Sequence, residues 1–215
     1  MNAVWLSALV VLTLALSGCG GGAARFNARL IIINSSFTHN SSAAAGGALI
    51  SDYGPDADPS FVTVTSVTFS GNTSGTNHGG GFSNRGYANL KNVTFKDNTN
   101  GIYNTGTTHL GNSVLDNLGS LNCDGDGTPI SSDGHNLSTD GSCALEQNGV
   151  PAQLGLRQLE STYFHLPLAG SPLINAAAGC PARDQRGALR VGACDIGAVE
   201  YGGLIPRALL PFIRR

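Results

Sequence analysis

The sequence predicts an all-β fold, a short parallel β-helix solenoid with an irregular, loop-rich C-terminal cap. The first observation is a pattern of apolar, Asn and Phe positions in LIIINSSFTHN, residues 30–40, which returns three more times along the chain. The second is that these windows are rich in Val, Ile, Thr and Phe, which favour strands, and hold no segment of helical period long enough for a helix. Such a unit buries its apolar side only against the next copy, so the repeat predicts stacked coils.

Each copy is defined by counting from its Phe. Apolar residues stand seven and five positions before it, Asn or Ser stands three before it, and Asn follows three after it. The positions in this frame are Leu30, Ile32, Asn34, Phe37 and Asn40; Val62, Val64, Ser66, Val67, Phe69 and Asn72; Ala88, Leu90, Asn92, Val93, Phe95 and Asn98; and, in a weaker copy, Thr108, Leu110, Asn112, Ser113 and Leu115, with Leu118 in place of the last Asn. We expect the Phe rings to lie one above another inside the coils.

The alternation of apolar positions slips by one residue at the Asn or Ser before each Phe. This slip predicts two short strands joined by a one-residue bend. Asn suits the bend because its short amide side chain tolerates left-handed torsions. The bends lie 32, 26 and 20 residues apart, so the insertions between copies fall in loops. The coils are predicted to span residues 26–118.

Two of the copies carry a resemblance. NSSFTHNSSAAAGGALI and VTFSGNTSGTNHGGGF resemble coils of the right-handed parallel β-helix, or pectin-lyase-like, superfamily, and in particular those of bacterial surface proteins. The shared feature is Phe-x-x-Asn followed by Gly-Gly and a small or apolar residue. This resemblance implies a right-handed winding. A β-sandwich with Gly/Asn turns could give two such matches by chance, and four matches in one frame favour the β-helix.

Composition limits the classes of partner. Only 12 % of the residues are charged, the formal net charge is −2, and Lys and Arg form no cluster outside the C-terminal tail. Nucleic acid is excluded as an expected partner, because binding it needs several side chains that neutralise phosphates.

The N-terminus predicts export. Residues 4–16 form an apolar run too short to span a bilayer, as in a secretory signal, here assigned to residues 1–18. Leu16-Ser17-Gly18-Cys19 also resembles the lipobox of bacterial lipoproteins, which implies lipidation of Cys19, a short tether at 19–25 and a membrane anchor. MNAVWLS lacks the usual Lys or Arg. The alternative is a gene fragment whose apolar start belongs to a truncated coil. The expected location is the cell envelope or the extracellular space.

Five cysteines are present, so four remain if Cys19 is lipidated. Four cysteines allow three pairings, of which the sequence neighbours are favoured, namely Cys123 with Cys143 and Cys180 with Cys194. A cysteine metal site is the competing interpretation, but no Cys-x-x-Cys spacing or His pair accompanies these residues.

Residues 119–201 are predicted to form the cap. The stretch 119–148 is Gly, Asp, Ser and Asn with little periodicity, and we expect irregular loops there. Its DGDGT segment, 124–128, is superficially similar to a Ca²⁺ loop but lacks the Gly and Glu that an EF-hand needs further along. LPLAGSPLINAA, CPARDQRG and CDIGAVEY, within 166–201, resemble the C-terminal module of the bacterial choice-of-anchor Q family. Asn175 and Val191 depart from that family's usual Asp and Pro.

Charge concentrates in this block at Asp184, Arg186, Asp195 and Glu200. Buried charges must be paired, so we expect Arg183, Arg186 or Arg190 to bridge carboxylates and close the open end of the helix. The alternative is an active site built from the three carboxylates. The tail, residues 202–215, is too short and too rich in Pro for a spanning helix.

Two functional classes follow. The first is a non-catalytic, exported bacterial cell-surface protein that presents a polar flank for adhesion or for contact with a polysaccharide or another cell-surface ligand. The second is a polysaccharide lyase or glycoside hydrolase, which the pectin-lyase-like resemblance implies. The aspartates of the coils, Asp52, Asp56, Asp58, Asp97 and Asp116, do not recur at one frame position. The first class is therefore preferred, and no catalytic residue, metal site or cofactor is predicted.

Overall fold

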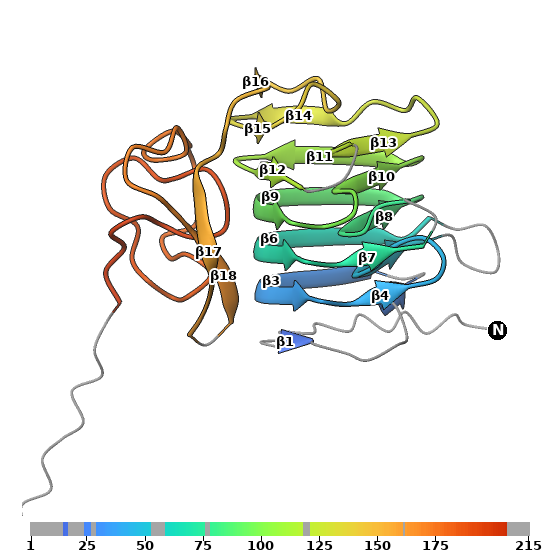
Figure 1. Cartoon of the computed structure of the whole chain (residues 1–215), viewed down its shortest axis with the longest axis horizontal. Coiled ribbons are helices and arrows are strands. Elements are labelled where there is room, and N and C mark those ends of the chain that lie inside the picture. The colour runs from blue at the N-terminus through green and yellow to red at the C-terminus, as the bar shows by residue number, and fades with distance from the viewer. Residues whose placement is uncertain are drawn as a thin grey trace, which may run out of the picture.

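The structure is a computed structural model that describes residues 15–16, 24–26, 29–52, 59–75, 78–117, 121–160 and 162–205. Its strands stack as coils of the predicted parallel β-helix, with the remaining C-terminal residues at one side of the stack (Figure 1). Cys19, most of the expected signal and tether, and residues 206–215 of the tail lie outside the described residues. None of the described ranges contains a helix long and apolar enough to cross a membrane.

Two parallel sheets form the wall of the helix. The larger runs in the order β1 (Ala15–Leu16), β3 (Arg29–Thr38), β6 (Phe61–Ser70), β9 (Tyr87–Lys96), β12 (Val114–Asp116), β15 (Leu137–Ser138) and β16 (Gln147–Asn148), with β11 (Thr107–Gly111) between β9 and β14 (Ser131–Gly134). The second runs β2 (Ala24–Phe26), β5 (Leu49–Ser51), β8 (Phe82–Asn84), β10 (Ile102–Asn104) and β13 (Cys123–Gly125). A small pair, β4 (Ser41–Ser42) and β7 (Thr73–Ser74), links them.

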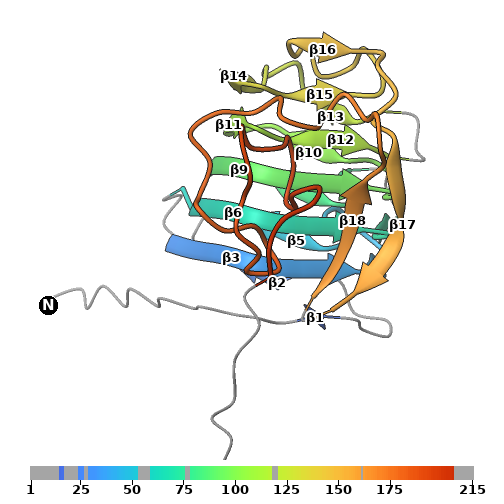
Figure 2. The same cartoon turned by 90° about the vertical axis from the view of Figure 1, so that its left-hand side faces the viewer.

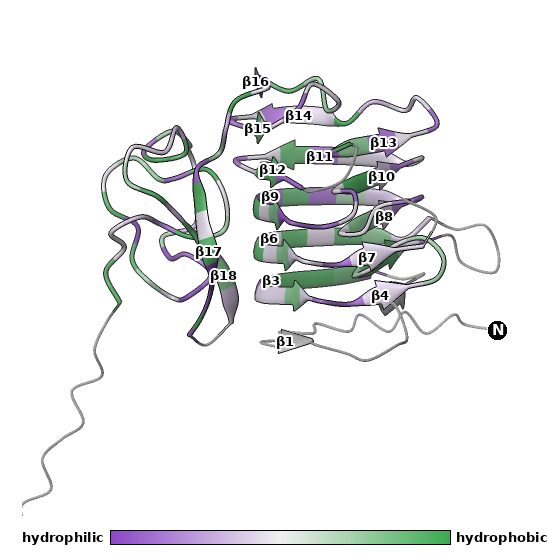
Figure 3. Ribbon diagram, viewed as in Figure 1, coloured by the Kyte–Doolittle hydropathy of each residue, from purple (hydrophilic) through white to green (hydrophobic). Residues whose placement is uncertain are grey.

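The Phe ladder is confirmed. Phe37, Phe69 and Phe95 are in register, and their rings stack with centroids 5.1 and 4.7 Å apart and planes within 6°. Leu115 pairs with Phe95 and continues the row. Each fully buried ring contributes about 1.5–3 kcal/mol, so this row is a main source of stability. Figure 3 shows the corresponding apolar colour along the stacked strands.

The one-residue bends are also confirmed. Asn34, Ser66, Asn92 and Asn112 all have left-handed torsions, with φ between 49° and 54°. Each bend turns the second half of its strand, so that one β-strand contributes to two faces of the coil.

A ladder of asparagines runs along the second bend. The backbone N and Nδ2 of Asn40 donate to Asn72 Oδ1 at 3.0 and 2.9 Å, and Asn72 donates in the same way to Asn98. The next member is Asn117, at 2.7 Å from Asn98 Nδ2, and then Asn122. The frame places this member at residue 118, which lies outside the described residues. The ladder is continued one residue earlier, because the fourth turn is shorter than the others.

The coils extend past residue 118, where the sequence predicts their end. Strands β13, β14 and β15 pair with β10, β11 and β12, and β16 follows as a further short strand. The apolar signal is lost here because polar residues and a disulfide take the inward positions. Cys123 pairs with Ile102 in the register of the inner row, and its bond to Cys143 closes this end.

The C-terminal module, residues 152–205, lies on the flank of the stack and not across its open end (Figures 1 and 2). It begins with an antiparallel hairpin, β17 (Leu154–Leu159) and β18 (Tyr163–Pro167), and continues as loops. Its contacts reach successive coils: Tyr163 N donates to Ser36 Oγ, Thr68 Oγ1 to Gln185, Ala198 N to Thr94 Oγ1, and Asn112 Nδ2 to Ala178 O. The expectation that this block closes the end of the helix is therefore wrong.

The module and the coils share a second apolar core. Its buried residues are Val114, Leu137, Ala152, Leu173, Ala177, Cys194 and Ile196. The second expected disulfide, Cys180–Cys194, lies at this contact, so both predicted pairings are confirmed. Burial of this core explains why the module lies against the flank.

The described strands near the N-terminus add two pairings. Ala15 and Leu16 pair in parallel with Ser36 and Phe37, and β2 pairs with β5. Both short strands lie within or beside the ranges assigned to the signal and the tether.

Candidate functional site

The coils present two outward faces on the larger sheet, and only one of them faces solvent. The open flank consists of two rows from the strand halves before the bend. These rows are Arg29–Phe61–Tyr87–Thr107 and Ile31–Thr63–Asn89–His109. The rows Ser36–Thr68–Thr94–Val114 and Thr38–Ser70–Lys96–Asp116, from the halves after the bend, form the covered flank. The names describe what lies on them: solvent on the first, and the C-terminal module on the second.

The open flank carries an exposed aromatic pair. Phe61 and Tyr87 are 44 % and 46 % exposed, and their rings stack with centroids 5.0 Å apart. The guanidinium of Arg29 lies 5.6 Å from the centroid of Phe61 on the neighbouring coil. Register places the small Thr107 next to Tyr87 on the side away from Phe61. That face of the Tyr87 ring is therefore bordered by a side chain too small to cover it.

Polar side chains stand beside this ring. Thr63, Asn89 and His109 are exposed and occupy one row, two residues along each strand from the aromatic row. His109 Nδ1 lies 3.2 Å from Asp133 Oδ1 on the next coil, and both side chains are about half exposed. An aromatic face with adjacent amide, hydroxyl and imidazole groups can stack on an apolar ring face and hydrogen-bond the ring's substituents.

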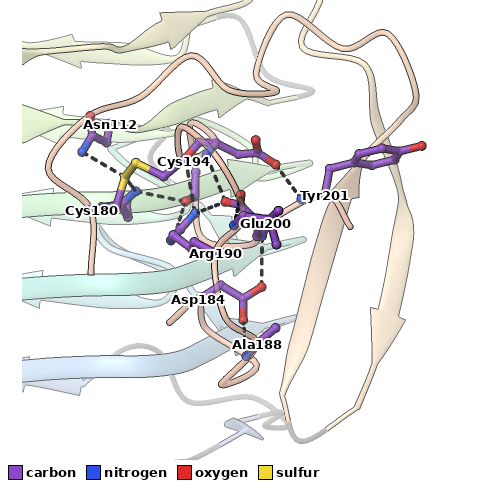
Figure 4. Close-up of polar contacts among 12 residues, drawn as sticks. Asn112, Cys180, Asp184, Ala188, Arg190, Cys194, Glu200 and Tyr201 are labelled. Carbon is purple, nitrogen blue, oxygen red and sulfur yellow. Dashed lines mark hydrogen bonds and ion pairs between the residues drawn. A yellow bond between two sulfur atoms is a disulfide. The ribbon is translucent and has the colours of Figure 1, made fainter. Parts of the chain in front are cut away.

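The predicted cap charges are buried in the module, and Figure 4 shows Asp184 and Glu200 among its loops. Asp184 accepts hydrogen bonds from Arg186 Nε and Nη2 at 2.9 and 2.7 Å, and Glu200 accepts from Arg190 Nη1 at 2.9 Å. Asp195 accepts from two backbone N–H groups, and burial raises the pKa of its carboxyl. The carboxylates therefore hold the loops together through Arg and backbone donors, as bridged charges do.

Two of the aspartates that looked scattered in the sequence converge. Lys96 Nζ lies 2.8 Å from Asp97 and 3.1 Å from Asp116, on the covered flank. Burial disfavours the charged amine, but the hydrogen bonds and charges of these carboxylates outweigh it and raise the pKa of Lys96. Asp52 is buried beside Arg85, and Asp56 and Asp58 lie outside the described residues.

A Ser–His contact lies close to this ion-paired group. Ser70 Oγ is 2.8 Å from His165 Nε2, and His165 Nδ1 is 2.8 Å from the carbonyl O of Gly155. A nucleophile, a base and a third group that orients the base would have this order. Both side chains are only 2 % exposed, so hairpin β17–β18 separates them from solvent in this conformation.

Sequence reasoning missed the open flank, although the signal was in the same frame. Arg29, Phe61 and Tyr87 stand eight positions before the ladder residues Phe37, Phe69 and Phe95. Alternation puts this position on the outward face, where a large aromatic side chain is conspicuous. His165 had no such signal, because its partner on the coils is 95 residues away.

Within the described ranges, no group of three or more His, Cys, Asp or Glu side chains comes together as a set of metal ligands. Comparison with family models, with curated proteins and with solved structures found no match for this chain.

Proposed function

We propose that the chain is a non-catalytic, exported cell-surface protein whose open flank contacts carbohydrate. The observation that carries the proposal is the exposed ring of Tyr87, whose face toward Thr107 is bordered only by a small side chain. A sugar ring stacked on this face would lie beside Asn89 and His109, whose amide and imidazole can hydrogen-bond hydroxyl groups. Asn89 and His109 stand on successive coils in one row, so polar groups line the path of a polymer that would run along the stack.

The two disulfides support export. The Cys123–Cys143 and Cys180–Cys194 disulfides persist in oxidising compartments and are rare in reducing ones. The open flank is mainly uncharged and polar, as expected of a surface that meets neutral hydroxyl groups. The resemblance to β-helix surface proteins and to the choice-of-anchor Q module points in the same direction.

The binding test compares two exposed tyrosines. Tyr87→Ala removes the stacking ring, and Tyr201→Ala removes a ring of similar exposure, 41 %, from the module. With an immobilised panel of neutral and uronate polysaccharides, we expect the wild type to retain at least one polymer and Tyr87→Ala to bind it about tenfold more weakly, as for an aromatic residue at the centre of an interface. Tyr201→Ala should bind as the wild type does. Equal loss in both variants, or retention of no polymer by the wild type, would contradict the proposal.

The same panel separates binding from catalysis. A non-catalytic protein releases no reducing or unsaturated ends from the polymer that it retains. Release that continues in Tyr87→Ala but stops in Ser70→Ala would assign the chain to the lyase or hydrolase class instead.

The anchor is a separate part of the proposal. We propose that Cys19 is acylated and that the expected signal is removed before it. Removal would take away β1 and uncover the lower edge of β3, because Ala15–Leu16 pair with Ser36–Phe37. Mass spectrometry of the exported protein should find a diacylglycerol-modified Cys19 at the N-terminus. A mature chain that still begins at Met1 would rule the anchor out.

A further inference from the structure

Hairpin β17–β18 meets the coils through a small set of side chains, which we call the seam. Tyr163 N donates to Ser36 Oγ at 3.1 Å, His165 contacts Ser70, and Arg157 contacts His39. Gln185 of the module also bonds Thr162 and Tyr163 of the hairpin and Thr68 of the coils. A two-stranded sheet is marginal without packing on a third element, so the seam and Gln185 together hold the hairpin on the flank.

The contacts of His165 fix the position of one ring proton. The carbonyl of Gly155 can only accept, so the ring carries its proton on Nδ1. In the neutral ring Nε2 keeps its lone pair and accepts from the hydroxyl of Ser70, whereas in the charged ring the same hydroxyl would accept from Nε2–H. The neutral ring is fully hydrogen-bonded at a position that is 2 % exposed.

The contact between His39 and Arg157 also requires a lone pair on the imidazole ring. A guanidinium group only donates hydrogen bonds, and Arg157 Nη1 contacts both ring nitrogens of the exposed His39, Nδ1 and, at 2.9 Å, Nε2. At least one of these nitrogens must therefore carry a lone pair. Protonation of the His39 ring would place two cations against each other, because a guanidinium group carries a positive charge.

The charges around the seam balance only while both imidazoles are neutral. From the coils, Lys96 faces Asp97 and Asp116; from the hairpin, Arg157 faces His39 and stacks on Tyr163 at 4.8 Å. On the other face of β18, Arg186 lies over Phe164 and is bound by Asp184 within the module. On the seam side of β18 there are thus two cations, Lys96 and Arg157, and two carboxylates, Asp97 and Asp116, both of which are already engaged by Lys96.

We propose that hairpin β17–β18 is a latch that acid releases from the coils. At neutral pH, His39 and His165 accept hydrogen bonds and hold the hairpin closed over Ser36 and Ser70. In mild acid both rings gain a proton, the seam acquires two unpaired positive charges, and the hairpin lifts while the coils stay folded.

The pKa directions agree with this geometry. Burial lowers the pKa of His165, and burial followed by the charge of Arg157 lowers the pKa of His39. A histidine with a lowered pKa in the closed state binds protons more readily in the open state. The stability of the seam is therefore complete above the ordinary pKa of about 6.5 and is lost as the pH falls below it.

Hydrogen exchange of the intact protein tests the latch. Amide protection, corrected for intrinsic exchange, is compared at about pH 7.5 and about pH 5, because histidine titrates between these values. From the higher to the lower pH it should fall at least tenfold in residues 154–167 and stay constant in the core strand β6. His165→Gln keeps a neutral acceptor and should reduce the loss of protection in the hairpin. The double variant His39→Gln/His165→Gln should reduce this loss further. His109→Gln, on the open flank, is the matched control and should respond as the wild type does.

Two results would overturn the latch. One is equal loss of protection in the wild type and in the His39→Gln/His165→Gln variant. The other comes from the wild type alone, by NMR titration of the His165 ring. The latch predicts that this ring gains its proton over the same pH range in which the hairpin loses protection. Protonation of that ring with the hairpin still protected would rule the latch out.

Discussion

The open and covered flanks come from the same strands, yet they have opposite environments. Strand β6 shows the difference within one element: Thr63 faces solvent before the bend at Ser66, and Thr68 is fully buried after it. Both are threonines on outward positions of a β-helix wall. The difference is that Thr68 donates to Gln185 of the C-terminal module, whereas Thr63 stands in a row that the module does not cover. An outward position is thus not an exposed position until the rest of the chain has been placed.

The largest difference is expected between the inside of a coil and its open flank. Phe69→Ala empties the centre of the ring stack and should lower the free energy of unfolding by about 3–5 kcal/mol. Phe61→Ala, eight residues earlier on the same strand, removes a ring that is 44 % exposed and should cost about 1 kcal/mol. Urea unfolding of the two variants measures both values. Equal costs would mean that the open flank is covered in solution.

The ion pairs of the module should come next. Glu200→Gln leaves the guanidinium of Arg190, 5 % exposed, without its carboxylate and should cost about 3 kcal/mol. Asp133→Asn removes the partner of His109 on the open flank, where both side chains are half exposed, and should cost less than about 1 kcal/mol. Thermal melts of both variants at neutral pH provide the comparison. A large effect at Asp133 and none at Glu200 would reverse the assignment of the two regions.

The disulfide at the module should have a smaller effect on the coils than on the module. Cys180→Ser/Cys194→Ser opens a loop with a sequence separation of 14 and should cost about 2–4 kcal/mol. Hydrogen exchange should rise in residues 168–205 and change little in β6 and β9. A melting temperature equal to that of the wild type would show that the module is held by its apolar core alone.

The smallest comparison uses two threonines on the two flanks. Thr94→Val leaves the backbone N–H of Ala198 buried without its acceptor and should cost about 1–3 kcal/mol. Thr63→Val on the open flank should change stability by no more than about 0.5 kcal/mol. Urea unfolding again measures the difference. If Thr63→Val is the more destabilising of the two, the open flank has a partner within the protein.

Much of the coil could be predicted because its signal is local. The position of each bend follows from a slip in alternation a few residues long, and the left-handed torsions of Asn34 and Asn112 agree with it. The coil strands beyond residue 118 could not be predicted in this way. There Ser138 pairs with Leu115 and Cys123 pairs with Ile102, so the register is kept by backbone pairing while the apolar pattern is lost.

The sequence by itself determined the repeating unit: the inward Phe and apolar rows, the bends, the Asn ladder as far as Asn98 and the pairing of cysteines close in sequence. These features depend on side chains within a few residues or in the same frame position. Only the tertiary structure decided which outward row stays in contact with water. The contacts that cover one flank join Thr68 to Gln185 and Ser70 to His165, at sequence separations of 117 and 95. No spacing rule links residues so far apart, because their contact depends on how the surfaces of the module and the coils fit together.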